Sequence, residues 1–141
     1  MILPDVNLLV YAYNADAPGH RRAKAWWETC LSESRSVGLP WAVLLGYLRL
    51  MTSPSVLEDP LPPVEAIGHL RSWLERPQAQ ILQPGPRHLE VLETLMSHRA
   101  SSQITTDVHL ASLAIEHRAE LFSNDSGFSH FPGLLWTNPL H

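Results

Sequence analysis

The chain opens with Met1-Ile2-Leu3-Pro4-Asp5-Val6-Asn7-Leu8-Leu9, in which three apolar residues run directly into a proline and an aspartate. A short apolar run bounded by a turn signal is typical of a buried strand. The apolar residues that follow have helical spacing and predict a short helix over residues 7–13. The predicted strand ends at Asp5 and a helix follows at once. We therefore expect polar side chains at the ends of the strands of this sheet.

Further short apolar runs alternate with helical patterns, which predicts an α/β fold with a central, mainly parallel sheet. We expect strands at residues 35–39, 80–82 and 119–123, and a surface loop at 52–63. Helices are expected at residues 20–34, 41–51, 63–74, 87–98 and 107–117, the last capped by Thr105 or Thr106. The spacing places Trp41, Leu45 and Ile67 on buried helix faces.

The composition indicates a single globular domain over residues 1–141, with 45% hydrophobic and 17% charged residues. The formal net charge of −4 argues against a broad basic groove for nucleic acid, but acids that hold a cation are compatible with it. The single cysteine, Cys30, excludes an intramolecular disulfide and a cysteine-based zinc site, and we expect it inside a helix. The sequence shows no signal peptide or membrane-length apolar run, so a cytoplasmic protein is expected.

Three aspartates stand where a parallel sheet would bring them to one edge. Asp5 follows the first strand, Asp107 opens a helix, and Asp125 follows the strand at 119–123. Ligands of open parallel sheets bind beyond the carboxyl ends of the strands, so these carboxylates can converge. Mg²⁺ or Mn²⁺ suits an oxygen-only site, which can activate water against a phosphodiester. We therefore expect all three aspartates to be metal ligands and catalytic residues.

Each of these residues also has a purely structural interpretation. Asp5 suits a helix N-cap, Asp107 an acid in a first helical turn, and Asp125 a turn. Their joint occurrence at matching ends of matching elements favours the metal site. The eight histidines show no paired ligand spacing, and His109 is expected to be a surface imidazole. Arg49 is expected either to hold a phosphate bidentately or to pair with one of the acids.

Three stretches resemble the signature blocks of PIN-domain toxins, and the whole chain is similar to the VapC toxins of bacterial VapBC toxin–antitoxin modules. These stretches are residues 1–9, Thr105-Thr106-Asp107-Val108-His109-Leu110-Ala111 and Ser123-Asn124-Asp125-Ser126-Gly127-Phe128. Residues 39–50 and 131–136 resemble a subgroup that is abundant in mycobacteria. No single block is specific, but their order and spacing together are.

The resemblance implies a PIN-like three-layer α/β/α domain that acts as a Mg²⁺-dependent endoribonuclease. It also implies a cognate VapB-type antitoxin and a homodimer. The family's metal ligands correspond to Asp5 and Asp107, with Asp125 acting directly or through water. Asn7 corresponds to the polar residue that supports the first acid, and Asn124 is expected to assist in the same way. The RNA target depends on surface shape and is left open by the sequence.

Gly46 stands where many PIN domains place a glutamate. A glycine inside a helix costs about 1 kcal/mol relative to alanine, so this residue does not serve helicity. Either another acid replaces the glutamate, with Asp16, Glu58 and Asp59 as candidates by charge, or the site works with three acids. The main alternative function is therefore a degenerate PIN module that binds RNA or an antitoxin without cleaving.

Other enzyme classes fit less well. A phosphotransferase of the haloacid-dehalogenase type needs a second aspartate two residues after the first, where this chain has Asn7. A receiver domain needs paired acids near its start and a late lysine, and the only lysine here is Lys24. The GxSxG motif of a Ser-His-Asp hydrolase is missing from the sequence.

Overall fold

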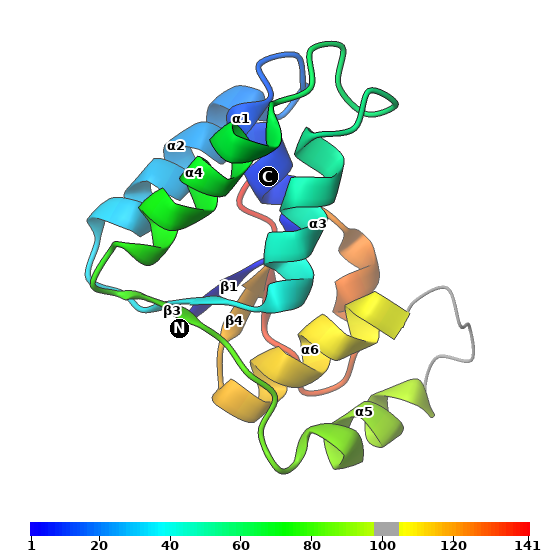
Figure 1. Cartoon of the computed structure of the whole chain (residues 1–141). Helices are drawn as coiled ribbons and strands as arrows, with labels where there is room; N and C mark the ends of the chain where they lie inside the picture. Colours follow the sequence, from blue (N-terminus) through cyan, green and yellow to red (C-terminus); the bar gives the residue numbers. More distant parts are fainter. Residues whose placement is uncertain (98–104) are drawn as a thin grey trace.

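The computed structural model describes residues 1–97 and 105–141 (Figure 1). In this part of the chain, five strands form one sheet in the order β3-β2-β1-β4-β5, and every neighbouring pair is parallel. The strands are β1 (Ile2–Pro4), β2 (Val37–Leu39), β3 (Ala79–Ile81), β4 (Glu120–Phe122) and β5 (Trp136–Thr137). The predicted α/β fold with a central parallel sheet is confirmed.

The helices form two groups that cover the two sides of the sheet. They are α1 (Val6–Tyr13), α2 (His20–Ser32), α3 (Trp41–Met51), α4 (Pro63–Leu74), α5 (His88–Met96) and α6 (Thr105–His117), with the 3₁₀ helix η2 (Ser126–His130). α1 contacts α2 and α3, and α3 contacts α4, whereas α6 packs on α5 and β4. Figure 1 shows α1, α2 and α4 gathered on one side and α5 and α6 on the other.

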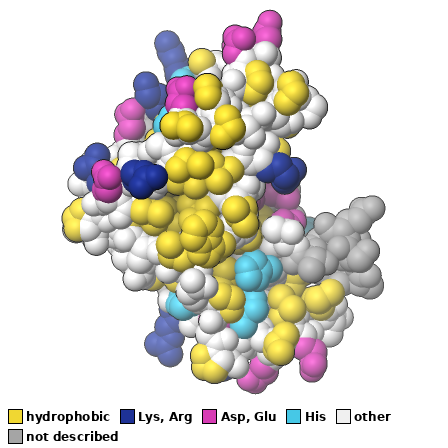
Figure 2. Space-filling model, viewed as in Figure 1, with side chains coloured by type: hydrophobic (Ala, Val, Ile, Leu, Met, Phe, Trp, Pro, Cys, Tyr) yellow, Lys and Arg dark blue, Asp and Glu magenta, His cyan; other side chains and the backbone are white. Residues whose placement is uncertain are grey.

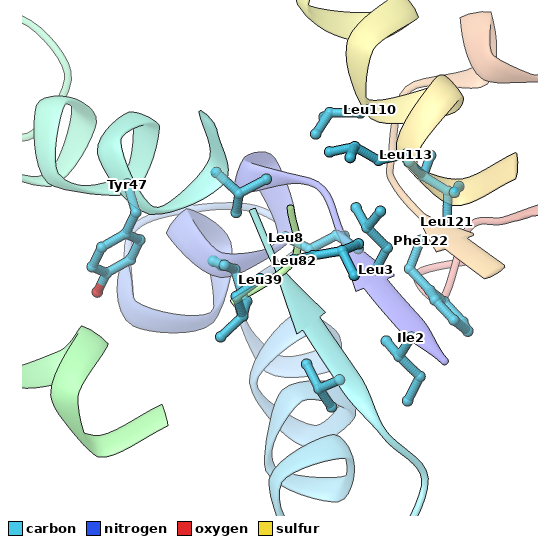
Figure 3. Packing of buried hydrophobic residues seen from close by; sticks show 14 of the residues in the cluster. Ile2, Leu3, Leu8, Leu39, Tyr47, Leu82, Leu110, Leu113, Leu121 and Phe122 are labelled. Carbon is cyan, nitrogen blue, oxygen red and sulfur yellow. The ribbon is translucent and has the colours of Figure 1, made fainter. Parts of the chain in front are cut away.

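The hydrophobic core lies between the sheet and these helices. Leu3 and Leu121, from the two neighbouring strands β1 and β4, are fully buried. Leu110 and Leu113 of α6 approach them from one side, as Figure 3 shows. Each fully buried leucine contributes about 1.5–3 kcal/mol relative to an exposed one. The burial of these residues fixes β1 and β4 next to each other and so positions the residues that follow them.

Three predicted core positions are wrong, because these helices carry apolar residues on more than one side. Trp41 and Leu45 of α3 are 47% and 57% exposed, and Ile67 of α4 is 42% exposed. The buried faces are formed instead by Val43, Leu44, Tyr47 and Met51 in α3, and by Ala66, Leu70 and Trp73 in α4. Helical spacing predicts that an apolar face exists, but it does not select which of two apolar faces meets the core.

Most element boundaries agree with the sequence within two residues, with a few differences. α6 begins at Thr105, so Thr105 and Thr106 both lie inside the helix and neither caps it. His98, the predicted end of the fifth helix, lies outside the described residues. The short elements β5 and η2 were not predicted, because each spans too few residues to show a hydrophobic repeat. No helix within the described residues combines the length and apolar character needed to cross a membrane.

Candidate active site

The carboxyl ends of β1 and β4 bring Asp5 and Ser123 side by side. Because Pro4 pairs with Phe122 in the parallel ladder, the next residue of each strand lies at the same level. The Ser123 hydroxyl donates to Asp5 Oδ2 at 2.7 Å, and the Val6 backbone N–H donates to Asp5 Oδ1 at 2.7 Å. Asp5 is therefore the N-cap of α1, and it is also the most buried of the candidate acids.

Ser123 is the centre of a hydrogen-bond network that the sequence did not reveal. While its buried hydroxyl donates to Asp5, it accepts from Asn7 Nδ2 at 3.3 Å and from the Asp125 N–H at 3.0 Å. Asn7 Oδ1 accepts from the Asn124 N–H at 3.5 Å, which ties α1 to the same loop. A serine at the end of an apolar strand gives no signal of its own. Only the register of β1 against β4 shows that it meets Asp5.

Asp125 lies at the surface beside this network and acts on Asp5 through its charge. Its Oδ1 accepts from the Gly127 N–H at 2.8 Å, so it also caps η2. Burial raises the pKa of the Asp5 carboxyl above its usual range, and the charge of Asp125 adds to this. The hydrogen bonds from Ser123 and Val6 oppose the rise in pKa without cancelling it. A cation near the two carboxylates would favour their ionised forms.

Asp107 lies in the first turn of α6 and is partly exposed. In the described part of the chain, no three His, Cys, Asp or Glu side chains form a group that could hold a metal ion. The three-acid metal site therefore stays a prediction. Mg²⁺ is usually held by one or two carboxylates, with waters and substrate phosphates completing its coordination. The carboxylate oxygens of Asp5 and Asp125 fit that kind of site.

Arg49 lies in the last turn of α3 and is exposed. It lines an apolar groove between α3 and α4, together with Leu48, Thr52, Pro63 and Ile67. Within the described residues, no ion pair joins Arg49 to an acid. Of its two expected roles, pairing with an acid is therefore not seen, and phosphate binding stays a prediction.

His109 differs from its prediction, because it belongs to a hydrogen-bonded group between α5 and α6. His88 Nδ1 lies 2.5 Å from Glu116 Oε1, and His88 Nε2 lies 2.9 Å from His109 Nδ1. Glu116 Oε2 also accepts from the Gly85 N–H at 3.1 Å. Burial and the neighbouring His88 lower the pKa of His109, although Glu116 opposes this. These contacts join α5 to α6, which is a structural role.

Gly46 faces the start of α1, next to the candidate site. A Cβ atom at this position would lie 3.4 Å from Val6 Cγ2, an ordinary van der Waals contact, and Val6 directly follows Asp5. A side chain therefore has room to begin at residue 46. The three replacement acids suggested by charge, Asp16, Glu58 and Asp59, are all exposed. None of them is among the groups that shift the pKa of Asp5, whereas Asp125 is.

We expect Gly46→Ala to stabilise the protein by about 0.5–1 kcal/mol, because alanine is the better helix former and its Cβ fits against Val6. Urea denaturation followed by circular dichroism measures this change. Gly68→Ala in α4 is the matched control, because a Cβ there would meet no atom within 4 Å. A gain at residue 68 with a loss at residue 46 would show that Val6 cannot accept the added methyl group.

Comparison with known proteins identifies the family and supports the fold of this chain. A PIN domain model matches residues 2–134. Ribonuclease VapC33 from Mycobacterium tuberculosis is 45% identical over 141 residues, which are 99% of each chain. The structure of VapBC2 from Rickettsia felis, bound to a DNA fragment from its promoter, aligns with a TM-score of 0.71 at 20% identity and covers 98% of each chain.

A toxin–antitoxin complex from Klebsiella pneumoniae aligns with a TM-score of 0.63 at 17% identity, covering 99% of this chain and 98% of its own. At such low identity, these two structures show a shared fold. The family assignment rests on the domain model, which spans almost the whole chain, and on VapC33, which matches it nearly from end to end. The protein belongs to the PIN-domain family and, within it, to the VapC group.

Proposed function

We propose that this protein is a Mg²⁺-dependent endoribonuclease that hydrolyses RNA phosphodiester bonds, with Mn²⁺ as an alternative ion. The observation that carries the proposal is the buried Asp5 carboxyl at the end of β1, held by Ser123 and facing the charge of Asp125. Burying an ionisable group without a cationic partner costs stability, so such a group is typical of a functional site. The 45% identical VapC33 is itself a ribonuclease by name.

In this proposal, Asp5 and Asp107 hold the metal ion, and Asp125 completes its coordination or orients a water molecule. When bound, Mg²⁺ would supply a Lewis acid that stabilises the charge developing on the scissile phosphate. The orientation of Asp5 is set by the protein itself, because both of its carboxylate oxygens accept hydrogen bonds from fixed donors. A carboxylate held in this way loses little freedom when it binds a cation.

The supporting residues keep the site in shape. Asn7 donates to Ser123 and accepts from the Asn124 N–H, so it joins Asp5 to the loop that carries Asp125. Asn124 Oδ1 accepts from Asn138 Nδ2 at 3.1 Å, which fixes that loop from its other side. We propose that Arg49, which is exposed on α3, holds a phosphate of the bound RNA.

The test is cleavage of transfer and ribosomal RNAs by the purified chain without a partner. We expect cleavage with Mg²⁺ or Mn²⁺, and none in the presence of a chelator. Failure of the folded, metal-supplied protein to cleave any of these RNAs would contradict the proposal. A degenerate module is the second candidate, because Gly46 removes the family's glutamate. RNA binding without metal-dependent cleavage would favour this alternative.

We further propose that a VapB-type antitoxin neutralises the enzyme. Support comes from the Klebsiella pneumoniae structure, a toxin–antitoxin complex with the same fold. We also propose that the chain works as a homodimer in the cytoplasm, where its proposed RNA substrate is found. The exposed Trp41 and Leu45 on α3 support a protein partner, because contiguous apolar surface marks interaction sites. Figure 2 shows a hydrophobic patch in the middle of the face on which α3 lies.

We expect Leu45→Glu to convert the homodimer into a folded monomer, because it would place a charge in the apolar surface of α3. Light scattering after size-exclusion chromatography gives the mass, and circular dichroism checks the fold. Val64→Glu is the matched control, because Val64 is also apolar and even more exposed but lies on α4. A dimer that survives Leu45→Glu, or one that Val64→Glu also disrupts, would contradict the placement of the interface on this part of α3.

A further inference from the structure

A pocket adjoins the candidate active site of Asp5 and Asp125 through Asn124. This pocket of about 390 Å³ lies between α1, the start of α2 and the C-terminal segment, and its lining includes Tyr11, Arg22, Asn124 and Leu140. Figure 1 shows the C-terminal segment returning to α1. Asn124 belongs to both places, because it lines the pocket while its backbone N–H bonds to Asn7 and its neighbour in the chain is Asp125.

Specific hydrogen bonds build the walls of this pocket. Arg22 Nη1 donates to the Leu140 carbonyl at 2.7 Å, which holds the C-terminal segment against α2. Asn138 supports the same segment, since its Nδ2 donates to Asn124 Oδ1 and its Oδ1 accepts from the Leu140 N–H at 3.0 Å. Gly19 lets the walls approach, because a Cβ there would lie 3.0 Å from Leu140 Cδ1. The hollow is therefore a built feature that joins residues far apart in the sequence.

The chemistry of the lining suits a flat, polar-edged ring. Tyr11 supplies an aromatic ring and Arg22 a planar guanidinium, and both groups are able to stack on a base. Asn124 Oδ1 is engaged by Asn138, whereas its Nδ2 has no partner in the described part of the chain and can donate to a ring acceptor. Among the described residues, no aspartate or glutamate side chain lines the pocket, unlike the neighbouring site. Its volume lies in the range of pockets that hold small organic groups.

We infer that this pocket binds one unstacked nucleobase of the RNA strand, next to the phosphate held at the acids. Tyr11, Arg22 and Asn124 would then determine where the strand is cut. The inference rests on the proposed ribonuclease function. It adds a binding site for the base beside the cut, whereas the aspartates would bind only the metal ion and the phosphate. Single-stranded RNA is recognised in this way, by bases that stack on side chains and bond through their edges.

Binding is tested first, with the four nucleoside 5′-monophosphates as probes in an NMR titration. We expect saturable shifts of the backbone amides of Gly19, Arg22 and Asn124 with at least one nucleotide. Pro18→Trp should abolish them, because Pro18 is exposed on the pocket rim and a tryptophan there would fill the space. Ala15→Trp is the matched control in the same loop between α1 and α2, because Ala15 is exposed but lies outside the pocket. Arg22→Gln is a second variant, expected to weaken binding if Pro18→Trp does not fold.

Cleavage is tested second, on RNAs in which each base around the mapped cut is removed in turn to leave an abasic site. Loss of the bound base should lower kcat/KM of the natural chain by roughly five- to a hundredfold, the range that base–aromatic stacking provides. Pro18→Trp should lower kcat/KM on intact RNA by a similar factor. Removing the base at the abasic position should not lower the kcat/KM of this variant any further. Ala15→Trp should behave like the natural chain.

The outcomes separate the two proposals. Cleavage without dependence on any base, together with no nucleotide shifts at the pocket, would overturn the base pocket and leave the ribonuclease intact. Pocket shifts without cleavage of any RNA would overturn the ribonuclease and retain a nucleotide-binding site. Shifts, base dependence and loss of both in Pro18→Trp would support the pocket.

Discussion

Replacing Asp5 with asparagine is expected to lower RNA cleavage by roughly a hundredfold to a thousandfold, because several kcal/mol of charge stabilisation depend on the metal site. The fold should survive, since asparagine caps helices as well as aspartate does and can still accept from the Val6 N–H. The measurement is kcat/KM on the RNA that the natural chain cleaves best, with saturating Mg²⁺. A variant that retains most of its activity would remove Asp5 from the proposed catalytic residues.

The same substitution should stabilise the metal-free protein at neutral pH. Burial raises the pKa of Asp5 in the folded chain, so the folded state disfavours the ionised form. Below the unfolded pKa of about 4, the carboxyl is neutral in both states and the folded protein bears no cost from it. As pH rises through the higher pKa of the folded state, the buried carboxyl ionises and the folded state is destabilised. At pH 7, Asp5→Asn removes this cost and should raise the Tm in the presence of a chelator. The gain should shrink toward zero at acidic pH.

Asp125→Asn is the control for this stability argument. Asp125 is exposed, so its neutralisation relieves no burial of charge. Asparagine can still accept from the Gly127 N–H and cap η2, so the variant acts on stability chiefly through the repulsion that Asp125 exerts on Asp5. Its effect on the Tm should therefore be clearly smaller than that of Asp5→Asn. Equal gains from the two variants would show that general charge repulsion, and not the burial of Asp5, destabilises the metal-free site.

The sequence predicted a parallel sheet and four of the five described strands because these signals are local, but it did not predict the strand order. Apolar runs bounded by proline, glycine and aspartate mark strands, and their alternation with helices predicts a parallel sheet. The carboxyl ends of neighbouring parallel strands share one edge, which is why Asp5 and Asp125 were expected together. The influence of Asp125 on Asp5 agrees with that expectation. Asp107 lies in the first turn of α6, which begins two residues earlier than predicted, and no metal-holding group of three appears in the described residues.

What the sequence did not predict depends on contacts between distant residues. Ser123 meets Asp5 across 118 positions of the chain, and His88 meets His109 across 21. Each of these pairings follows from strand register or from helix packing, which periodicity does not encode. The exposure of Trp41 and Leu45 has the same origin, because the packing of the surrounding elements decides which face of α3 is buried. The pocket at Asn124 likewise depends on Arg22 and Asn138, which hold the C-terminal segment in place.

Ser123→Ala is expected to lower cleavage by about ten- to a hundredfold, although Ser123 need not touch the RNA. The variant removes the hydroxyl that donates to Asp5 Oδ2 and that accepts from Asn7 and the Asp125 N–H. The hydrogen bond from Ser123 opposes the rise in the pKa of Asp5, so its loss should raise that pKa further. A higher pKa leaves less of the carboxylate ionised. The acidic limb of the plot of kcat/KM against pH should therefore move to higher pH.

Ser112→Ala is the matched control for this experiment. Both serines are fully buried, but the Ser112 hydroxyl lacks a hydrogen-bond partner within the described residues. Removing a buried hydroxyl without a partner should leave stability equal or slightly higher, and the pH dependence of cleavage should not change. If Ser123→Ala loses activity without moving the acidic limb, then its role is to shape the site and not to govern the ionisation of Asp5. If it loses no activity, the network around Asp5 is structural, and Asp5 is positioned sufficiently by the Val6 N–H alone.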